Sequence, residues 1–248
     1  MISVCMATYN GEHFIKEQID SILPQLSQDD ELIISDDGST DRTLEIIASY
    51  NDERIKVFHH QRNSEYSKIK HGRNFYFVTN NFENALRQAK GNYIFLSDQD
   101  DVWMPKKVSR CISLLKTCDC VIHNYSVIDK EKKLLKKSQF ENVPIHKTVI
   151  MNVLDSHFRG CCMVFKSNFL KYIIPIPKKV IGHDYWIGAL INHFGKLFYE
   201  MKPLILYREY DESVSSKRKR SLVYKISFRF RLFQALRKRI KEQSNEKY

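Results

Sequence analysis

The sequence predicts an α/β protein in which a mostly parallel sheet is covered by helices on both faces. Along the first half of the chain, short apolar runs of strand length alternate with segments whose apolar residues recur at helical spacing. This alternation is typical of βαβ units. Several of the apolar runs also stop abruptly at acidic or turn-forming residues. In sheets of this kind the strand ends are where ligands bind.

The first half supplies strand–helix units in sequence. Strands are expected at three places: Ile2–Ala7, Glu31–Ser35 and Ile55–His59. The helix after the first strand has an apolar stripe and ends at Pro24, and the helix after the second has Thr40 or Asp41 as its N-cap. After a polar, irregular stretch we expect a helix at Asn81–Lys90, which stops at Gly91.

The second half is less regular, but strands and helices still alternate. We expect a strand beginning at Asn92, a helix from Pro105 to about Leu115, a strand at Cys120–His123, a charged surface turn at Lys130–Lys137, a strand at Gly160–Phe165, a helix at His183–Phe194 and a strand at Pro203–Tyr207. No internal repeat or low-complexity linker interrupts this part, so we expect one domain.

The segment Asn92–Trp103, NYIFLSDQDDVW, is the most informative part of the chain. Its apolar start ends in four polar residues: Asp98, Gln99, Asp100 and Asp101. Carboxylates at the end of a buried strand repel one another and lose hydration unless a cation shares the site. Oxygen ligands suit Mg²⁺ or Mn²⁺, which commonly bind one or two protein carboxylates together with substrate phosphates. The segment therefore predicts a site for a metal ion and a diphosphate.

Two other strand ends carry polar clusters of the same kind. Thr8-Tyr9-Asn10 follows the first strand, and Asp36-Asp37 follows the second. Because the carboxyl ends of parallel strands lie at one edge of a sheet, we expect both clusters to line one crevice with Asp98–Asp101.

The composition restricts the class of protein. A chain of 248 residues with 43% hydrophobic content can bury a full core. No apolar run approaches the roughly 18 residues needed to span a bilayer. The start MISVCMATYN lacks the basic residues and cleavage site of a secretory signal. The six cysteines show no C-x-x-C spacing, so we expect reduced thiols in a cytoplasmic protein.

The net charge of +11 is concentrated at the C-terminal end. Residues 217–248 hold twelve Lys or Arg and two Glu, whereas residues 1–216 hold 28 basic and 27 acidic residues. We therefore divide the chain into a domain, 1–216, and a basic amphipathic tail, 217–248. Apolar residues at helical spacing in the tail predict a helix suited to an anionic membrane surface. A strand packed on the domain is the alternative, because four apolar residues also alternate: Ile226, Phe228, Phe230 and Leu232.

Five segments, taken in order, resemble one enzyme family: MATYNGEHFIKEQIDSIL, IISDDGSTDRT, GNYIFLSDQDDVWMPKK, RGCCMVF and HDYW. Over roughly residues 1–215 the chain resembles the family-2 glycosyltransferases of the GT-A (Rossmann-like) fold, particularly bacterial rhamnosyltransferase-like enzymes of polysaccharide assembly. The resemblance implies transfer of a sugar from a nucleotide diphosphate to an acceptor hydroxyl, with inversion at the anomeric carbon. It implies dTDP-rhamnose or a UDP-hexose as donor, and a lipid-linked or oligosaccharide acceptor.

The resemblance also implies roles for single residues. On the donor side it implies Thr8, Tyr9 and Glu12 at the rim of the nucleotide pocket, Asp37 as acceptor of a base N–H, Asp98 facing the ribose or sugar and sharing the metal site, and Asp100 as direct metal ligand. Asp184 resembles the catalytic base, and an inverting transfer needs one carboxylate to take the proton from the attacking hydroxyl. The candidates for acceptor binding are Trp103, Gly160, His183 and Trp186.

Structural roles remain open for several of these residues. Asp36 and Asp37 suit a turn before Gly38, and Asp184 suits a helix cap. His183 suits a structural role, and the two tryptophans suit the core. One position departs from the family, in which the last strand is usually followed by an arginine and then a histidine. Here YREYDES has Arg208, which can hold a phosphate, and Tyr210 at the histidine position. The last metal or diphosphate contact then falls to Glu209 or to water.

These features favour an enzyme with Mg²⁺ or Mn²⁺ as cofactor, peripheral on the inner face of the cell membrane and without a nucleic-acid partner. One alternative is a nucleotidyltransferase, in which a Gly-rich, basic phosphate loop would follow the first strand. The segment Thr8–Ile15 has one glycine and no such loop. The other alternative is a nucleic-acid-binding protein that acts through the tail, which leaves the acidic strand ends unexplained.

Overall fold

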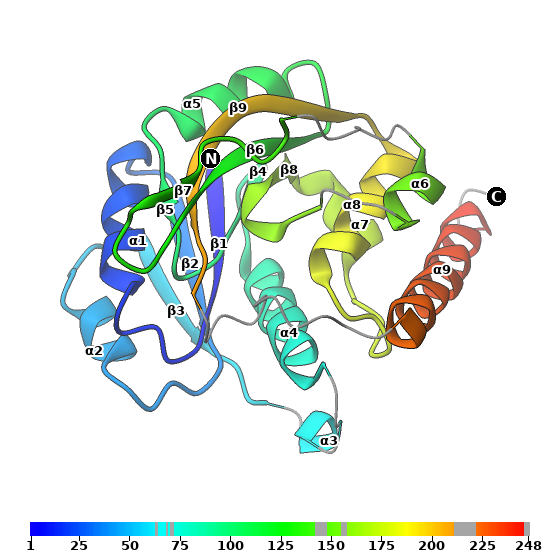
Figure 1. Ribbon diagram of the computed structural model, residues 1–248, viewed down its shortest axis with the longest axis horizontal. Coiled ribbons are helices and arrows are strands. Elements are labelled where there is room, and N and C mark those ends of the chain that lie inside the picture. The colour runs from blue at the N-terminus through cyan, green and yellow to red at the C-terminus, as the bar shows by residue number, and fades with distance from the viewer. Residues whose placement is uncertain are drawn as a thin grey trace.

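The computed structural model describes residues 1–62, 64–67, 69, 72–141, 148–154, 158–210 and 222–245. Its strands are β1 (Ile2–Thr8), β2 (Glu31–Asp36), β3 (Ile55–His59), β4 (Tyr93–Ser97), β5 (Val102–Trp103), β6 (Cys120–Ile128), β7 (Leu134–Lys136), β8 (Met163–Lys166) and β9 (Leu197–Arg208). Its helices are α1 (Ile15–Ile22), α2 (Thr43–Ala48), α3 (Ser64–Ser67), α4 (Arg73–Gln88), α5 (Lys107–Leu115), α6 (Val149–Leu154), α7 (Leu170–Ile173), α8 (His183–Phe194) and α9 (Leu222–Asn245). Figure 1 shows the sheet crossing the molecule with helices on both sides, which confirms the α/β class.

The strands form one sheet in the order β3-β2-β1-β4-β8-β6-β9-β5, with β7 paired to β6. The first four run parallel to one another. In the second half β9 runs parallel to β6, but β8 runs antiparallel to both β4 and β6. Every residue of β2 is buried, as expected for a parallel strand covered on both faces. This topology brings the carboxyl ends of β1, β2 and β4 to one edge of the sheet.

The helices of the first half cover the sheet with their apolar stripes. In α1 the buried isoleucines are Ile15, Ile19 and Ile22, and Pro24 follows in a 3₁₀ turn at Leu23–Gln25. Helix α4 begins at Arg73, well before the expected start at Asn81. Its first turns carry Tyr76 and Phe77, which are buried in a small cluster of their own. Packing of these rings stabilises a helix that the polar local sequence did not indicate.

The elements of the second half are longer than the sequence predicted. Strand β6 continues past His123, and β9 begins before Pro203. Asn124 explains the extension of β6, because its side-chain oxygen accepts N–H groups of Gln139 (3.0 Å) and Phe140 (2.9 Å) and so satisfies a polar group in a buried strand. The strand expected from Gly160 is a 3₁₀ turn at Gly160–Cys162 followed by β8.

The helix predicted for the tail is confirmed at α9, and the alternative strand is wrong for residues 222–245. Leu232 and Leu236 are buried against the rest of the chain. Figure 1 shows α9 (red) at the edge of the molecule opposite α1 and α2. Residues 217–221 and 246–248 lie outside the described part, so the division at 216 stays a prediction. No helix in the described ranges is both long enough and apolar enough to cross a membrane.

Candidate active site

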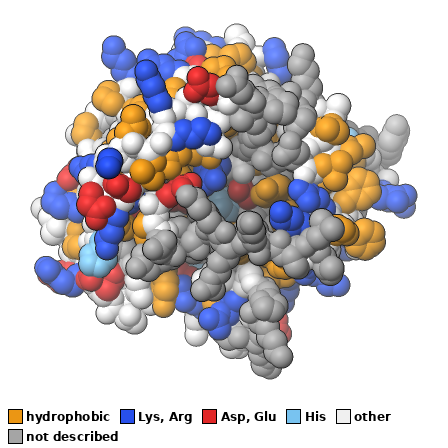
Figure 2. Space-filling view, in the orientation of Figure 1, with side chains coloured by type: hydrophobic (Ala, Val, Ile, Leu, Met, Phe, Trp, Pro, Cys, Tyr) orange, Lys and Arg blue, Asp and Glu red, His pale blue; other side chains and the backbone are white. Residues whose placement is uncertain are grey.

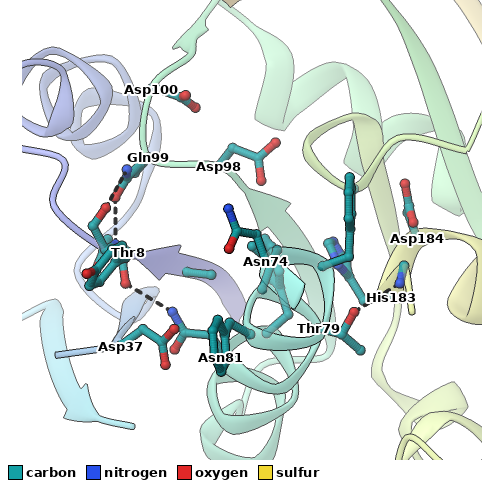
Figure 3. Close-up of a pocket in the computed structure, with 18 of the residues that line it drawn as sticks. Thr8, Asp37, Asn74, Thr79, Asn81, Asp98, Gln99, Asp100, His183 and Asp184 are labelled. Atoms are coloured by element: carbon teal, nitrogen blue, oxygen red, sulfur yellow. Dashed lines mark hydrogen bonds between the residues drawn. The ribbon is translucent and has the colours of Figure 1, made fainter. Parts of the chain in front are cut away.

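The carboxyl ends of β1, β2 and β4 meet in a cavity of about 750 Å³. Thr8 and Tyr9 lie at the end of β1, Asp37 directly follows β2, and Asp98 and Asp100 follow β4, and all five line the cavity. Figure 3 shows Thr8, Asp37, Asp98 and Asp100 around a shared space, with α4 beside it. Residues of α4 and of the start of α8 complete the wall. The predicted convergence of the three strand ends is confirmed.

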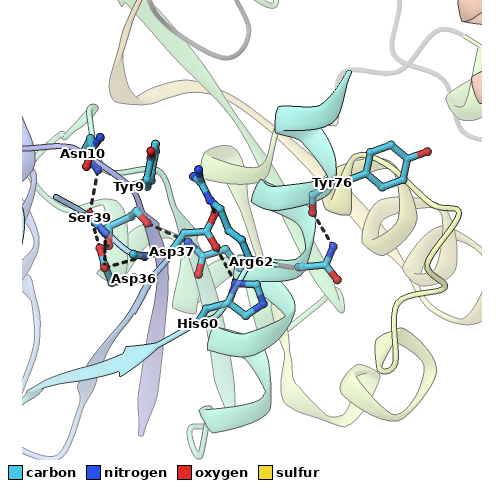
Figure 4. A network of polar contacts seen from close by, with 12 residues as sticks. Tyr9, Asn10, Asp36, Asp37, Ser39, His60, Arg62 and Tyr76 are labelled. Atoms are coloured by element: carbon cyan, nitrogen blue, oxygen red, sulfur yellow. Dashed lines mark hydrogen bonds and ion pairs between the residues drawn. The ribbon is translucent and has the colours of Figure 1, made fainter. Parts of the chain in front are cut away.

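Asp36 builds the loop after β2 and does not face the cavity (Figure 4). Its Oδ1 accepts the backbone N–H groups of Gly38 (3.1 Å) and Ser39 (2.9 Å), and its Oδ2 accepts the hydroxyl of Thr8 (3.0 Å). Gly38 has a φ of +81°, which few other residues adopt without strain. Asp36 thus has the turn-forming role, and the turn directs the next carboxylate, Asp37, toward the cavity.

Asp37 is buried and has two side-chain partners, a histidine and an arginine (Figure 4). His60 Nδ1 lies 2.7 Å from its Oδ1, and Arg62 donates its Nε–H to Oδ2 over 2.5 Å. The Arg62 guanidinium lies 3.4 Å from the ring centre of Tyr9 and 4.6 Å from that of Phe77. A carboxylate acceptor and a guanidinium donor therefore lie side by side at one end of the cavity. Sequence analysis missed both His60 and Arg62, because they fall in the stretch expected to be irregular and belong to no motif.

The loop after β4 concentrates negative charge. Burial raises the pKa of Asp98 to about 7, and repulsion from Asp100 adds to the effect. Burial also raises the pKa of Asp100 and raises that of Asp101 well above its usual value. One oxygen of Asp101 accepts the N–H of Arg208 (3.0 Å), and the other has no partner within the described ranges. A cation in this loop would offset both the repulsion and the lost hydration.

The donor set fits a hard divalent cation. Ligand atoms of Asp98, Asp101 and Cys161 lie within 4.8 Å of one another, and Asp100 belongs to the same loop. Carboxylate oxygens are what Mg²⁺ and Mn²⁺ prefer. Burial raises the pKa of the Cys161 thiol far above its ordinary value, which keeps it protonated and makes it a poor ligand. Asp101, which the sequence analysis did not assign to the metal, belongs to the group.

The end of β9 holds the acidic loop in place. Tyr210 donates its hydroxyl to Oδ2 of Asp100 (2.6 Å), and its ring lies against Phe14 (5.1 Å between centres). Arg208 is buried and donates to the backbone oxygen of Asp100 (2.9 Å) and to the carboxylate of Glu17 (2.6 Å). Arg208 does not line the cavity, so the structure does not support its predicted contact with a phosphate. Its place is behind the loop, where it fixes the backbone of Asp100.

Asp184 lies at the opposite end of the cavity from Asp37, and Figure 3 shows Asp98 between them. It is in the first turn of α8, and its Oδ1 accepts the backbone N–H of Tyr185 (2.9 Å). The N-cap of α8 is Gly182, without a side-chain cap bond, so the capping role considered for Asp184 is wrong. Its carboxylate lines the cavity from within the first turn.

His183 is held by packing. Its ring stacks on Phe82 with 3.9 Å between centres, and neither ring nitrogen has a hydrogen-bond partner among the described residues. A Cβ at Gly160 would overlap Nε2 of His183, so glycine leaves the room that the ring needs. Burial lowers the pKa of His183 to about 3, which keeps the ring neutral at ordinary pH. Both residues line the cavity, as expected for acceptor-binding candidates.

Acid should destabilise the protein partly through His183. An unfolded histidine has a pKa of about 6.5, and the folded value is about 3, so stability that is complete above pH 6.5 is lost as the pH falls toward 3. At pH 5 the loss should reach at most about 2 kcal/mol. His183→Leu should reduce the fall in Tm between pH 7.5 and pH 5, whereas His13→Leu, at an exposed histidine, should not. An equal fall in all three proteins would contradict this assignment.

Besides Arg208, three predicted contact residues lie away from the cavity. Glu12 accepts the backbone N–H of Arg42 (3.0 Å) at the start of α2. Trp103 and Trp186 are 3% and 0% exposed, and the indole N–H of Trp186 donates to the backbone oxygen of Ile173 (2.9 Å). Neither indole is placed where it could contact a bound acceptor. Of the two roles considered for them, the structure shows core packing.

Amide side chains join the strand ends, a role that the sequence did not predict for them. Gln99 accepts the N–H of Tyr9 (2.9 Å) and donates to its backbone oxygen (3.1 Å), which ties the end of β1 to the acidic loop. Asn81 donates to the backbone oxygen of Thr8 (3.1 Å), and both amides line the cavity. Single amides carry no recognisable pattern. The position of Gln99 between two aspartates was the one available signal.

Two curated relatives share much of this sequence. The dTDP-rhamnosyl transferase RfbG of Shigella flexneri is 29% identical over 223 residues, covering 84% of this chain and 72% of its own. The Escherichia coli enzyme named UDP-Glc:alpha-D-GlcNAc-diphosphoundecaprenol beta-1,3-glucosyltransferase WfgD is 31% identical over 131 residues, covering 52% of this chain and 47% of its own. A glycosyltransferase of Rickettsia typhi with no assigned activity is 25% identical, and this chain spans 66% of its length. Several relatives are therefore clearly longer than this chain.

Solved structures share the fold. TarS of S. aureus (residues 1–349) in complex with UDP-GlcNAc has a TM-score of 0.65 at 19% identity, covering 89% of this chain and 62% of its own. Glucosyl-3-phosphoglycerate synthase of Mycobacterium tuberculosis, in complex with Mn²⁺, UDP and glucosyl-3-phosphoglycerate, has a TM-score of 0.54 at 19% identity, covering 96% of this chain and 79% of its own.

The family model "Glycosyl transferase family 2" matches residues 3–173, which is well over half of the chain and includes β1, β2 and β4 with their polar ends. This match agrees with the α/β fold, with the acidic cavity and with the names of the relatives, and it removes the nucleotidyltransferase alternative. The chain belongs to glycosyl transferase family 2 and is a transferase of the GT-A fold.

Proposed function

We propose that this enzyme is an inverting, metal-dependent glycosyltransferase of bacterial surface polysaccharide synthesis. Its donor is dTDP-rhamnose or a UDP-hexose, and its acceptor is a hydroxyl of a lipid-linked or growing saccharide. One observation carries the proposal: Asp37, the acidic loop after β4 and Asp184 all face one cavity. The cavity thus offers a base-binding end, a diphosphate-binding centre and a carboxylate on the far side, which are the parts an inverting transfer requires.

Asp37 and Arg62 support a uracil or thymine base. Each of these bases presents an N–H beside carbonyl oxygens, which complements a carboxylate acceptor next to a guanidinium donor. Tyr9 and Phe77 hold the guanidinium from its faces and so fix its orientation. This arrangement fits dTDP and UDP donors alike, and the relatives RfbG and WfgD are named for one of each.

The acidic loop supports metal dependence. Asp98 and Asp100, with Asp101 beside them, would hold Mg²⁺ or Mn²⁺ through carboxylate oxygens. When bound there, the ion would supply positive charge against the phosphate oxygens of the leaving nucleoside diphosphate. The protein's own part is to fix the loop. Arg208 holds the backbone of Asp100, and Tyr210 holds one of its carboxylate oxygens, which leaves the other to face the ion.

Tyr210 should therefore determine metal affinity. Tyr210→Phe removes the hydroxyl that orients Asp100 and should weaken Mn²⁺ binding in the presence of UDP by about tenfold. Tyr210→His restores the nitrogen donor usual in the family and should favour Mn²⁺ over Mg²⁺ relative to the unchanged protein. Isothermal titration of each ion measures both effects. The control Tyr50→Phe, far from the loop, should bind Mn²⁺ as the unchanged protein does. If Tyr210→Phe also bound Mn²⁺ with unchanged affinity, Tyr210 would have no part in metal binding.

Asp184 supports the inverting mechanism. A single displacement requires the acceptor hydroxyl to attack from the side opposite the leaving diphosphate, with a carboxylate there to take its proton. The loop carboxylates are on the leaving-group side and would be engaged with the ion. Asp184 lines the other end of the cavity, and its bond to the N–H of Tyr185 fixes the orientation of its side chain.

The proposed acceptor and the proposed location of the enzyme are supported by features outside the cavity. WfgD is named for a diphosphoundecaprenol-linked acceptor. For this protein we propose a lipid-linked acceptor and a peripheral position on the inner face of the cell membrane. The basic segment 217–248 would bind the anionic surface, and we propose no nucleic-acid partner. The charge distribution supports this, because residues 1–216 have a net charge of only +1 and offer few unpaired cations to a polynucleotide.

A panel of nucleotide sugars tests the proposal. Thermal shift should show stabilisation by dTDP-rhamnose or by a UDP-hexose, and the effect should grow when Mg²⁺ or Mn²⁺ is added, because a ligand that binds the folded state raises Tm. GDP-mannose should give a much smaller shift, since a purine does not fit the pyrimidine geometry at Asp37. A shift that is equal for GDP-mannose and UDP-glucose would refute the base assignment. A Tm shift that is the same with and without Mg²⁺ or Mn²⁺ would refute the metal dependence.

A further inference from the structure

Helix α9 is fixed to the body of the protein. Leu232 and Leu236 are buried on one side of the helix. Arg239, also buried, donates to the backbone oxygens of Tyr172 (2.5 Å) in α7 and of Pro175 (2.6 Å) after it. These contacts give the helix a defined orientation, so the side chains on its outer side form a defined surface as well.

Helix α6 lies beside α9. Arg229 of α9 donates to the backbone oxygens of Val153 (3.3 Å) and Leu154 at the end of α6. The last carbonyl groups of a helix are without partners inside the helix, so a cation there satisfies them and complements the helix dipole. The two helices therefore present their outer sides as neighbours.

The outer sides of α6 and α9 expose large apolar side chains. The described residues include thirteen large hydrophobic side chains that are exposed, and six of them lie on these two helices: Ile150, Met151, Leu154, Ile226, Phe230 and Phe233. Ile150 is 62% exposed and Phe230 60%. We call these six residues the α6–α9 surface. Figure 2 shows hydrophobic side chains next to Lys and Arg at the right-hand edge, over the positions of α6 and α9 in Figure 1. A concentration of this kind marks an interaction site.

The surroundings of the α6–α9 surface are cationic. Between residues 222 and 245 there are seven Lys or Arg and one Glu, a net charge of +6. An open groove of about 460 Å³ along the same helix adds two more cations, Lys178 and Lys179. Exposed aliphatic and phenylalanine side chains with lysine and arginine around them suit the interface of an anionic bilayer. Nucleic acid would use the cations and leave the apolar side chains in water.

We infer that α6 and α9 together form the membrane-binding surface, in which the six apolar side chains enter the headgroup region of an anionic bilayer and the cations bind its phosphates. This inference rests on the proposed function and adds α6 to it, so that the tail is not sufficient alone. The opposite side of α9 borders the cavity. Phe228 of α9 lines the cavity and packs edge-on against Tyr185 of α8 (5.2 Å), next to Asp184.

Vesicle sedimentation with the full chain tests the inference. The unchanged protein should bind vesicles of phosphatidylcholine with 30% phosphatidylglycerol at least about tenfold better than pure phosphatidylcholine, and less well in high salt. The double variant Ile150→Ser/Leu154→Ser, which leaves α9 intact, should bind at least about tenfold less. Phe230→Ser/Phe233→Ser should lose a similar amount. The matched control is Leu134→Ser/Leu135→Ser, at two exposed leucines of β7, and should bind within about twofold of the unchanged protein.

Three outcomes would overturn the inference. Normal vesicle binding by the α6 variant would mean that α6 takes no part. A similar loss in the Leu134/Leu135 control would mean that binding is not localised. A gel shift with DNA at physiological salt that exceeds vesicle binding would make nucleic acid the partner. UDP or dTDP binding in solution should be unchanged in all three variants. If nucleotide binding fails in every protein while vesicle binding behaves as expected, the proposed function fails and the membrane surface stands.

Discussion

Replacing Asp184 with asparagine should lower kcat by about 10³-fold and leave nucleotide-sugar affinity within about twofold. The amide cannot accept the proton of the attacking hydroxyl. Its oxygen can still accept the N–H of Tyr185, so α8 should begin as before. The donor site is at the other end of the cavity, which is why binding should persist. Initial rates with saturating donor, together with isothermal titration of UDP, separate the two effects.

One control variant makes the result at Asp184 specific. Asp29→Asn, at an exposed aspartate of the surface, should have normal kcat and normal affinity. With a soluble acceptor analogue, the assay does not require the enzyme to bind a membrane. Turnover within about tenfold of normal in the Asp184→Asn variant would place the base elsewhere, because general-base catalysis contributes about 10²–10⁴-fold.

Replacing Asp100 with asparagine should remove the metal-dependent part of donor binding. The change keeps the size of the side chain and its bond to Tyr210, but it deletes one negative charge from the acidic loop. We expect at least about tenfold weaker Mg²⁺ binding in the presence of UDP and a fall of about 10²-fold or more in kcat/KM. In metal-free buffer the variant should bind UDP as well as the unchanged protein or better, since a repulsive charge near the diphosphate is gone.

The opposite signs with and without metal distinguish this prediction from simple damage to the site. A variant that merely misfolds would lose UDP affinity under both conditions. Equal loss with and without Mg²⁺ would therefore contradict the metal role of Asp100, and so would an unchanged response to Mg²⁺.

Much of the donor half was predictable from the sequence, because local patterns specify it. An apolar run that ends in acids is visible in one stretch of chain, and the parallel topology then brings Thr8, Asp37 and Asp98 together without further information. The class of the fold followed from the alternation of strand and helix segments along the first half of the chain. What failed was the direction of side chains. Glu12 and Arg208 belong to matching motifs, yet hydrogen bonds to Arg42 and to Asp100 hold them outside the cavity.

The rest of the site depends on long-range packing, which leaves no local pattern. Arg62 comes from a stretch without periodicity, and its position is set by the rings of Tyr9 and Phe77. Tyr210 was recognisable as a departure from the family, but its contact with Asp100 spans 110 positions of the chain. The same holds for α9, whose helical pattern was clear while its attachment to the body was not. Contacts of this kind follow from the assembled fold and not from neighbouring residues.

The most direct test of the account is a crystal structure determined with UDP and Mn²⁺, in which the anomalous signal locates the ion. The account predicts a peak within about 2.5 Å of carboxylate oxygens in the loop Asp98–Asp101, in contact with the diphosphate. It also predicts that the uracil lies at Asp37 and Arg62 and that Asp184 lies across the cavity from the diphosphate. A peak bound by other residues, or UDP held outside this cavity, would contradict it.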